Sequence, residues 1–386
     1  MAIYKLFPEK DATIYSEYEL KNTGIDEILE LDLAFNNNTP SGVSGSLITE
    51  VSRYALKFPD SGITNIIDNK ISGSYKAYLK LFVANASKIP VDYTLECYPI
   101  SGAWNMGTGR FDISPELQNG VNWEFRSNSG SNAWLTSSFT TYATASFIST
   151  SYQSRPGGGN WYTGSTTLNP VATQSYTYIT DKDISFDVTN AVTLQYSGSK
   201  GIIGGIINDG LLVKNTDDNE FNSNIQFNLK YFSMDTHTVY PPQLEFRWND
   251  ITFDTGSSTS TITTDLNPVV SLGNNKQEFE QNSIQKFRVY ARDRFPTRAF
   301  QTSSVYLTNK YLPSSSYYSV VDLNSGDTVF DFDTDYTKIG ADSTSNYFTL
   351  YMDGLEPERY YKILIKTIID STELVLDDDY YFKVKL

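Results

Sequence analysis

Short stretches of alternating apolar and polar residues recur along the chain. In residues 77–84 (AYLKLFVA), Leu79, Leu81 and Val83 fall at every second position. A period of two places these side chains on one face of an extended segment, which predicts a half-buried β-strand. The same alternation is present in residues 241–248, 284–292 and 379–386. Because these stretches are short and end near Gly, Pro, Asn or Asp, they are typical of a β-sandwich rather than of alternating strands and helices.

Helical periodicity is scarce. In residues 185–198 (SFDVTNAVTLQYSG), Val188, Ala191 and Val192 recur at roughly helical spacing, and Gly198 can end a helix there. We predict one or two helical turns in this segment and an all-β fold elsewhere.

Two segments poor in strand pattern suggest how the chain is divided. Residues 128–164 are rich in Ser, Thr and Gly and predict an inserted surface loop. Residues 254–268 are rich in Ser and Thr and poor in aromatic residues, which predicts a linker. With 386 residues, the chain is long enough for two or three domains. We therefore expect one β-sandwich over 1–253 and a second β-sandwich region over 269–386. The second region could consist of two small modules.

Composition narrows the classes of function. The net charge of −15 argues against a nucleic-acid-binding surface. Cys97 is the only cysteine, so no disulfide can form within the chain and stability must come from packing or assembly. The first residues are charged by Lys5, which predicts no signal peptide. No apolar run reaches the roughly 18 residues of a membrane span, so no membrane insertion is expected.

The sequence points to no catalytic centre. A Ser-His-Asp triad would have to use His237, the only histidine, which lies between two predicted strands. Carboxylates are abundant, but residues 216–220 and 377–379 lack the spacing of an EF-hand calcium loop. A glycosidase needs only two carboxylates, and no pair stands out. We predict a non-enzymatic protein without a cofactor; a structural Ca²⁺ is compatible with the fold, but no ligands can be assigned.

One candidate binding group lies in residues 157–164 (GGGNWYTG). The neighbouring glycines can leave the rings of Trp161 and Tyr162 exposed, and the amide of Asn160 can bind hydroxyl groups. These residues would suit a glycan. They would serve equally well as anchors against a neighbouring subunit, which is the interpretation we favour.

Three other tryptophans are expected to be structural. Trp104 lies in the glycine-containing stretch 101–111 (SGAWNMGTGRF), where its indole can close one end of a β-sandwich. Burial removes about 150 Å² or more of an aromatic side chain from water. We place Trp104, Trp123 and Trp248 in the core.

A second candidate contact is basic. Arg288, Arg292 and Arg294 fall at even spacing on a predicted strand of an otherwise acidic chain, so they share one strand face. This face could bind an acidic partner surface, such as the Asp-rich turns of a neighbouring copy. Solvated charges on a strand are the alternative interpretation.

The order of several weak motifs resembles a known family. Residues 11–31 (DATIYSEYELKNTGIDEILEL), 95–111 (LECYPISGAWNMGTGRF) and 184–192 (ISFDVTNAV) are similar to the DNRLRE-type β-sandwich domain, a jelly-roll relative of carbohydrate-binding modules. The resemblance spans residues 3 to about 250, and its tryptophan, here Trp104, is a framework residue. The insertion after Trp123 is longer than in that family.

The C-terminal part resembles a different group. Residues 311–322 (YLPSSSYYSVVD), 354–363 (GLEPERYYKI) and 377–386 (DDDYYFKVKL) look like the C-terminal segment of structural proteins from large tailed bacteriophages, where the module is immunoglobulin-like. The tyrosine-bearing strand after the 354–358 turn is similar to a tyrosine corner.

Together the two resemblances imply a virion structural protein, part of a tail, fibre, collar or capsid surface. Its partners would be its own copies and other virion proteins, and its location the virion. A carbohydrate-binding adhesin that contacts a host surface glycan is the alternative. A polysaccharide depolymerase, resting on fold analogy alone, is third.

Overall fold

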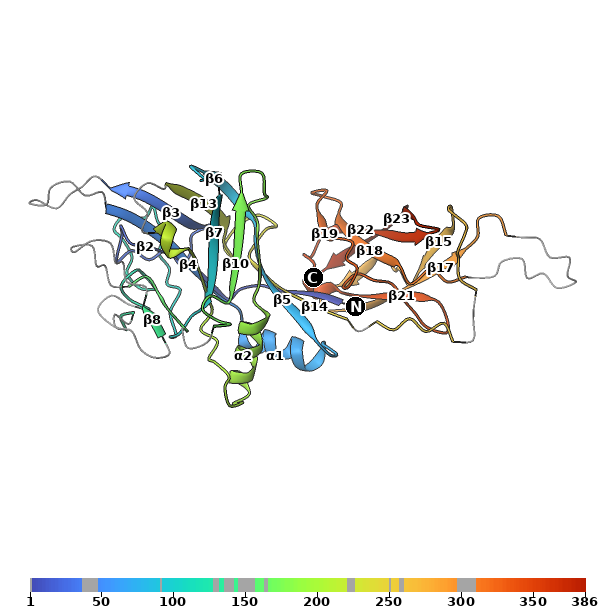
Figure 1. Cartoon of the computed structure of the whole chain (residues 1–386), viewed down its shortest axis with the longest axis horizontal. Helices are drawn as coiled ribbons and strands as arrows, with labels where there is room; N and C mark the ends of the chain where they lie inside the picture. Colours follow the sequence, from blue (N-terminus) through green and yellow to red (C-terminus); the bar gives the residue numbers. More distant parts are fainter. Residues whose placement is uncertain are drawn as a thin grey trace, which may run out of the picture. The chain divides into compact units, whose positions relative to one another are not determined.

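The computed structural model describes residues 2–36, 48–90, 92–127, 132–134, 142–144, 157–162, 166–220, 226–249, 251–256, 260–296 and 310–386. Strands predominate among them, and the predicted all-β sandwich class is confirmed (Figure 1). The chain forms two compact units. The N-terminal unit comprises Leu6–Lys70 and Lys76–Glu245; the C-terminal unit comprises the residues up to Lys5, Ile71–Tyr75 and Phe246–Leu386.

The N-terminal unit is built on an eight-stranded sheet of order β10-β7-β12-β4-β3-β13-β6, in which β2 also pairs with β4. Its neighbouring strands are antiparallel. The strands are β2 (Lys10–Tyr15), β3 (Ile28–Asn36), β4 (Ile48–Lys57), β6 (Val83–Ser87), β7 (Asp92–Pro99), β10 (Ala172–Thr177), β12 (Leu211–Asn215) and β13 (Phe227–Phe232).

The first 250 residues also form two smaller sheets and three helices among the described residues. A four-stranded sheet has the order β1-β14-β5-β11, and β8 pairs with β9. The strands are β1 (Ala2–Leu6), β5 (Tyr75–Leu81), β8 (Tyr142–Thr144), β9 (Asn160–Tyr162), β11 (Ile184–Asp187) and β14 (Gln243–Trp248). The helices are α1 (Asp60–Asn69), α2 (Thr189–Ser199) and α3 (Asp217–Glu220). Helix α2 confirms the predicted turns, and it buries Ala191, Val192 and Gln195.

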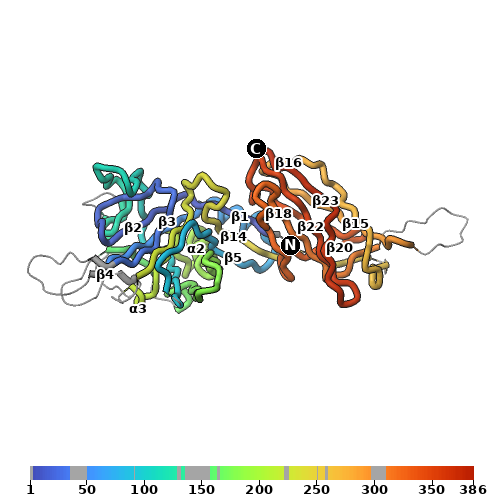
Figure 2. Tube along the Cα trace, turned by 90° about the horizontal axis from the view of Figure 1, so that it is seen from above, coloured from blue at the N-terminus to red at the C-terminus, as the bar shows by residue number. Residues whose placement is uncertain are grey.

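The C-terminal unit has two sheets, of order β15-β17-β21-β20 and β16-β23-β22-β18-β19. In the second sheet β18, β22 and β23 lie side by side (Figure 2). The strands are β15 (Val269–Gly273), β16 (Glu278–Glu280), β17 (Ile284–Arg292), β18 (Ser316–Asp322), β19 (Thr328–Phe330), β20 (Gly340–Ala341), β21 (Asn346–Tyr351), β22 (Tyr360–Ile369) and β23 (Thr372–Lys385), with a 3₁₀ turn, η1, at Met352–Gly354.

Aromatic rings from both sheets meet in the core of the C-terminal unit. The ring of Phe348 lies 5.3 Å from that of Phe287 in the same sheet and 4.4 Å from that of Tyr318 in the other. Phe287 also contacts Phe382, at 5.9 Å between centroids. Stacked and edge-on pairs of this kind add about 0.5–1.5 kcal/mol each beyond burial. The core therefore sits between two sheets, as a sandwich requires.

The two compact units divide earlier than the linker predicted at 254–268. The division falls between Glu245 and Phe246, inside β14. Of the predicted linker, residues 257–259 lie outside the described residues. The remainder belongs to the C-terminal unit, where Ile262 is buried and its backbone N–H donates to the carbonyl of Tyr311 at 2.9 Å.

Candidate binding surfaces

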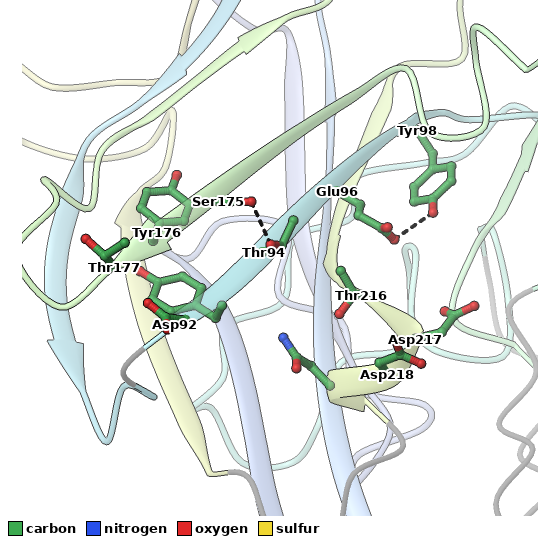
Figure 3. A pocket seen from close by; sticks show the side chains of 12 residues that line it. Asp92, Thr94, Glu96, Tyr98, Ser175, Tyr176, Thr177, Thr216, Asp217 and Asp218 are labelled. Carbon is green, nitrogen blue, oxygen red and sulfur yellow. Dashed lines mark hydrogen bonds between the residues drawn. The ribbon is translucent and has the colours of Figure 1, made fainter.

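A groove of about 710 Å³ lies on the β7–β10 side of the large sheet, beside α3 (Figure 3). Strand β7 supplies alternate residues to one face, because successive side chains on a strand point in opposite directions. The cross-strand partners on β10 continue that face. The lining residues are Asp92, Tyr93, Thr94, Glu96, Tyr98, Ser175, Tyr176, Thr177, Thr216, Asp217, Asp218 and Asn219.

Hydroxyl groups and carboxylates dominate this lining. Thr94 and Ser175 are paired across the two strands, and their hydroxyl oxygens are 2.8 Å apart. The hydroxyl of Tyr98 donates to Glu96 Oε2 at 2.7 Å. The carboxylates of Asp92 and Asp218 are exposed and have no ion-pair partner among the described residues. The groove is therefore polar, acidic and open to solvent.

Lys214 is the cation beneath the groove. Its side chain is fully buried, and its Nζ lies 2.7 Å from Asp217 Oδ1, 3.6 Å from Glu220 Oε2 and 3.8 Å from Glu96 Oε2. Burial raises the pKa of Glu96. Burial also acts to raise the pKa of Asp217, but the charge and hydrogen bond of Lys214, together with the charge of Arg53, outweigh it and lower that pKa. The positive charge of Lys214 is thus already paired with carboxylates of the protein itself.

A buried ion pair anchors α3 to the sheet. Arg53 on β4 donates to both carboxylate oxygens of Glu220, with Nε 3.1 Å from Oε1, and neither side chain reaches solvent. A further guanidinium N–H of Arg53 donates to the carbonyl of Gly158 at 3.0 Å. Desolvated charges are costly unless paired and hydrogen-bonded, and this bidentate pair satisfies both conditions.

The sequence predicts that the aromatic rings of the binding group on β9 are exposed, but the structure places the larger ring inside. Trp161 is only 6% exposed, and its ring lies 4.9 Å from that of Tyr98 and 5.8 Å from the Arg53 guanidinium. Asn160 is fully buried, and neither polar atom of its side chain has a hydrogen-bond partner among the described residues. Tyr162 is partly exposed. Trp161 therefore supports the groove from within, through Tyr98, and neither it nor Asn160 offers an external platform for a sugar.

Three glycines allow the backbone before β9 to pack against the interior. Gly157, Gly158 and Gly159 all have positive φ, at 120°, 77° and 106°. A Cβ at Gly158 would lie 2.7 Å from the Trp123 ring, so only glycine allows the backbone to approach that indole. The remaining parts of the predicted loop, 128–131, 135–141, 145–156 and 163–164, lie outside the described residues.

The three tryptophans expected in the core are all buried. The indole N–H of Trp104 donates to the carbonyl of Asp209 at 2.7 Å. Trp123 lies against Arg53, whose guanidinium is 5.2 Å from the ring. Trp248 contacts Tyr351 at 5.4 Å between centroids.

The three arginines predicted to share a strand face differ in their surroundings, and only Arg288 and Arg292 lie on β17, which ends before Arg294. Arg288 contacts both carboxylate oxygens of Asp342, at 2.6 and 2.7 Å, and hydrogen bonds from Arg288 and neighbouring groups outweigh burial and hold the pKa of Asp342 well below its usual range. Arg292 donates to the carbonyl of Asp293, and Arg294 donates through Nε to the carbonyl of Asn267. Neither of these two guanidiniums meets a carboxylate within the described part of the chain. The next residue, Phe295, is 87% exposed.

The loop after α2 exposes isoleucines. In residues 201–207, here named the isoleucine tip, Ile203 is fully exposed and Ile202 and Ile207 are more than half exposed. The backbone of the tip is nevertheless ordered: the N–H of Ile202 donates to Ser197 O, and that of Ile206 to Leu194 O, both at 2.9 Å. The tip is thus an apolar surface held in place by main-chain bonds.

Four acidic residues line a smaller pocket of about 390 Å³, and two of them, Asp26 and Glu30, lie in different environments. Burial is the main cause that raises the pKa of Asp26 to about 6. Glu30 accepts a hydrogen bond from the Tyr15 hydroxyl at 2.9 Å and lies 3.0 Å from Lys230 Nζ. Phe111 also lines this pocket, and its ring is 5.0 Å from that of Tyr15.

The described ranges meet the requirements neither of a metal site nor of a membrane-spanning helix. No group of three or more His, Cys, Asp or Glu side chains there is placed to hold a metal ion. No helix of those ranges is long and apolar enough to cross a membrane.

Comparisons with known proteins give little. No family model matches the sequence, and no curated protein matches it. Among solved structures, Parabacteroides merdae β-glucuronidase with glycerol in its active site is 8% identical, with a TM-score of 0.16, over 99% of this chain and 36% of that one. Bacteroides uniformis β-glucuronidase 3 is 8% identical, with a TM-score of 0.15, over 98% and 35%. The chain spans about a third of these enzymes. Similarity this low carries no statement on fold or activity.

Proposed function

We propose that this chain is a non-enzymatic structural protein of a tailed-bacteriophage virion, acting through protein–protein assembly in a tail, fibre, collar or capsid surface. The isoleucine tip is the observation that supports assembly. Contiguous exposed apolar surface on an otherwise well-packed protein marks a contact site. The virion setting is supported by the order of sequence motifs that resemble phage structural proteins.

The physical case rests on what the tip gains from a partner. Burying an isoleucine side chain completely is worth about 1.5–3 kcal/mol, and three such side chains project here. Main-chain hydrogen bonds already order the loop, so little conformational entropy remains to be lost on binding. The expected partners are further copies of the chain and other virion proteins, with neither cofactor nor nucleic acid required.

Incorporation into particles tests this proposal. We expect mass spectrometry of purified virions to detect the chain, and cryo-electron microscopy to place it in a symmetric array with the isoleucine tip against a neighbour. Ile203→Asp should fold, by circular dichroism, but fail to enter particles. Val375→Asp, at another exposed apolar residue, is the matched control. Absence of the chain from virions, or a tip that faces solvent in the particle, would contradict the proposal.

Carbohydrate binding is the second candidate. The observation in its favour is the groove, where hydroxyls of Thr94, Ser175 and Thr177 lie beside the carboxylate of Asp92. Such groups can exchange hydrogen bonds with sugar hydroxyls. A glycan array probed with the whole chain and with Thr94→Val tests it: a host-surface glycan should bind the former and bind the latter at least about tenfold more weakly.

A polysaccharide depolymerase is a third, weaker candidate. It requires a protonated carboxyl group near a second, ionised one. Asp26 and Glu30 in the smaller pocket are a pair with such contrasting surroundings. Loss of polysaccharide cleavage in both Asp26→Asn and Glu30→Gln would support this candidate, and absence of cleavage by the unaltered chain would exclude it.

A further inference from the structure

We propose that copies of this chain associate head to tail, with the segment Arg292–Phe295 of one copy bound in the acidic groove of a second copy. This inference rests on the proposed role in assembly and names one of its contacts. It uses a surface distinct from the isoleucine tip.

The groove presents uncompensated negative charge. Four carboxylates line it, those of Asp92, Glu96, Asp217 and Asp218. The cation beneath them, Lys214, is fully buried and already contacts Asp217 and Glu220. Asp92 and Asp218 have no ion-pair partner within the described ranges. A ligand that brings positive charge is therefore the one that this groove suits electrostatically.

The segment Arg292–Phe295 has the complementary chemistry. Three of the chain's ten arginines lie within 288–294, although the chain as a whole carries a charge of −15. Arg288 is neutralised by Asp342, whereas the guanidinium groups of Arg292 and Arg294 donate to carbonyl oxygens and meet no carboxylate among the described residues. A guanidinium can bind a carboxylate through two parallel hydrogen bonds. The exposed ring of Phe295 adds the aromatic anchor that contact sites often contain.

The groove is better suited to this segment than to a sugar. Its three tyrosines, Tyr93, Tyr98 and Tyr176, are all buried, so no ring face is free for stacking on a pyranose. The hydroxyl of Tyr98 is already bound to Glu96. The groove offers negative charge rather than an aromatic platform. Two arginines form stronger hydrogen bonds to carboxylates than neutral sugar hydroxyls do.

Association of this kind has a consequence for symmetry. The groove and the arginine segment are different surfaces, so each copy would offer one to a neighbour on either side. Contacts between unlike surfaces produce rings when the rotation closes and filaments when it does not. A ring or an open array, rather than a two-fold dimer, is the expected product.

Charge exchange between the two surfaces tests the proposal. The groove variant is Asp92→Lys with Asp218→Lys, and the segment variant is Arg292→Glu with Arg294→Glu. Asp92 and Asp218 are chosen because they are exposed and pair with no cation in the described part of the chain, so their replacement should leave the fold intact. In sedimentation velocity, each variant alone should self-associate at least about tenfold more weakly than the unaltered chain. An equimolar mixture of the two should regain association, because the reversed surfaces again carry opposite charge.

Controls separate this contact from other effects. Glu280→Lys with Asp335→Lys makes the same change in net charge away from the groove and should not weaken association. Unimpaired association of either variant, or a mixture that regains nothing, would overturn the head-to-tail contact, as would an unaltered chain that stays monomeric. The head-to-tail contact would also be overturned if a glycan bound the groove and both charge variants self-associated as strongly as the unaltered chain. None of these outcomes affects the isoleucine-tip experiment, so the proposed function stands or falls separately.

Discussion

At the scale of single residues, the most perturbed carboxyl group lies away from both pockets. Asp11 on β2 is 1% exposed, and its Oδ2 accepts a hydrogen bond from the backbone N–H of Met234 at 2.7 Å. Burial raises the pKa of Asp11 to about 8, with the charge of Asp235 acting in the same direction. The hydrogen bond from Met234 opposes this shift without cancelling it. Folding therefore favours the protonated form of this side chain.

This shift predicts a stability that falls as pH rises. The unfolded chain releases the Asp11 proton near pH 4, whereas the folded protein holds it until about pH 8. The stabilising effect is complete below pH 4 and is lost progressively between these values. Asp11→Asn keeps an acceptor for Met234 and cannot ionise. It should raise the free energy of unfolding at pH 8 relative to the unaltered chain, by about 1.4 kcal/mol per unit of pKa difference, and change it little at pH 4.

Urea unfolding at both pH values measures this effect, and Asp68→Asn provides the contrast. Hydrogen bonds from Lys200 and Tyr196 lower the pKa of Asp68, so its contribution is present above pH 4 and disappears as pH falls. The two substitutions should therefore change the pH dependence in opposite directions. A difference between Asp11→Asn and the unaltered chain that is the same at pH 4 and pH 8 would refute the assignment.

At the scale of elements, helix α3 is held by ion pairs to the sheet, and the most buried of them joins Glu220 to Arg53. Four residues are too few for a helix to be stable by itself, and Glu220 binds this one to Arg53 on β4. Glu220→Ala would leave the guanidinium without its counter-ion in the interior, which costs about 3–5 kcal/mol of stability. Because α3 forms one side of the groove, the same substitution should also weaken any ligand of the groove.

Equilibrium urea denaturation measures that cost. The control is Glu116→Ala, which removes an exposed carboxylate 3.2 Å from Lys21 Nζ and should cost less than about 1 kcal/mol. Arg53→Met combined with Glu220→Leu should lose less than Glu220→Ala, since neither charge is then left alone. Equal losses for Glu220→Ala and Glu116→Ala would show that the buried pair does not anchor the helix.

The elements themselves could be predicted where their pattern is local. Alternation identified β5, β14, β17 and β23, and helical spacing identified α2. Helix α1 was missed, because helical turns were predicted only in residues 185–198, whereas this helix begins at Asp60. The polar residues that β7 and β10 bring to the groove were not predicted, because nothing in the sequence of β7 shows that β10 lies beside it.

Contacts between distant segments account for what sequence could not predict at the groove. Arg53 and Glu220 are 167 positions apart, so no spacing rule brings them together. The glycines at 157–159 indicated unusual backbone conformations, but their neighbour, Trp123, is set by tertiary packing. Trp161 was therefore expected outside, although the fold turns it against Tyr98.

At the scale of the whole molecule, net charge works against association. Copies that each carry −15 repel one another over distances comparable to the Debye length. An arginine segment that meets an acidic groove supplies attraction only at close range. Both effects weaken as salt is added, so the salt dependence of the unaltered chain alone would not separate them.

Two variants of equal net charge do separate them. Arg292→Glu with Arg294→Glu makes the same change in charge as Lys276→Glu with Lys88→Glu, which replaces two exposed lysines away from the groove. Repulsion between copies is then matched, and the remaining difference in affinity belongs to the arginine contact. Between about 0.01 M and 1 M salt the Debye length shrinks from about 30 to about 3 Å. The lysine variant should associate more tightly at low salt, by about tenfold or more, and this advantage should shrink steadily as salt rises. An advantage that stays constant over the whole range would show that the contact is held by Phe295 or by shape rather than by charge.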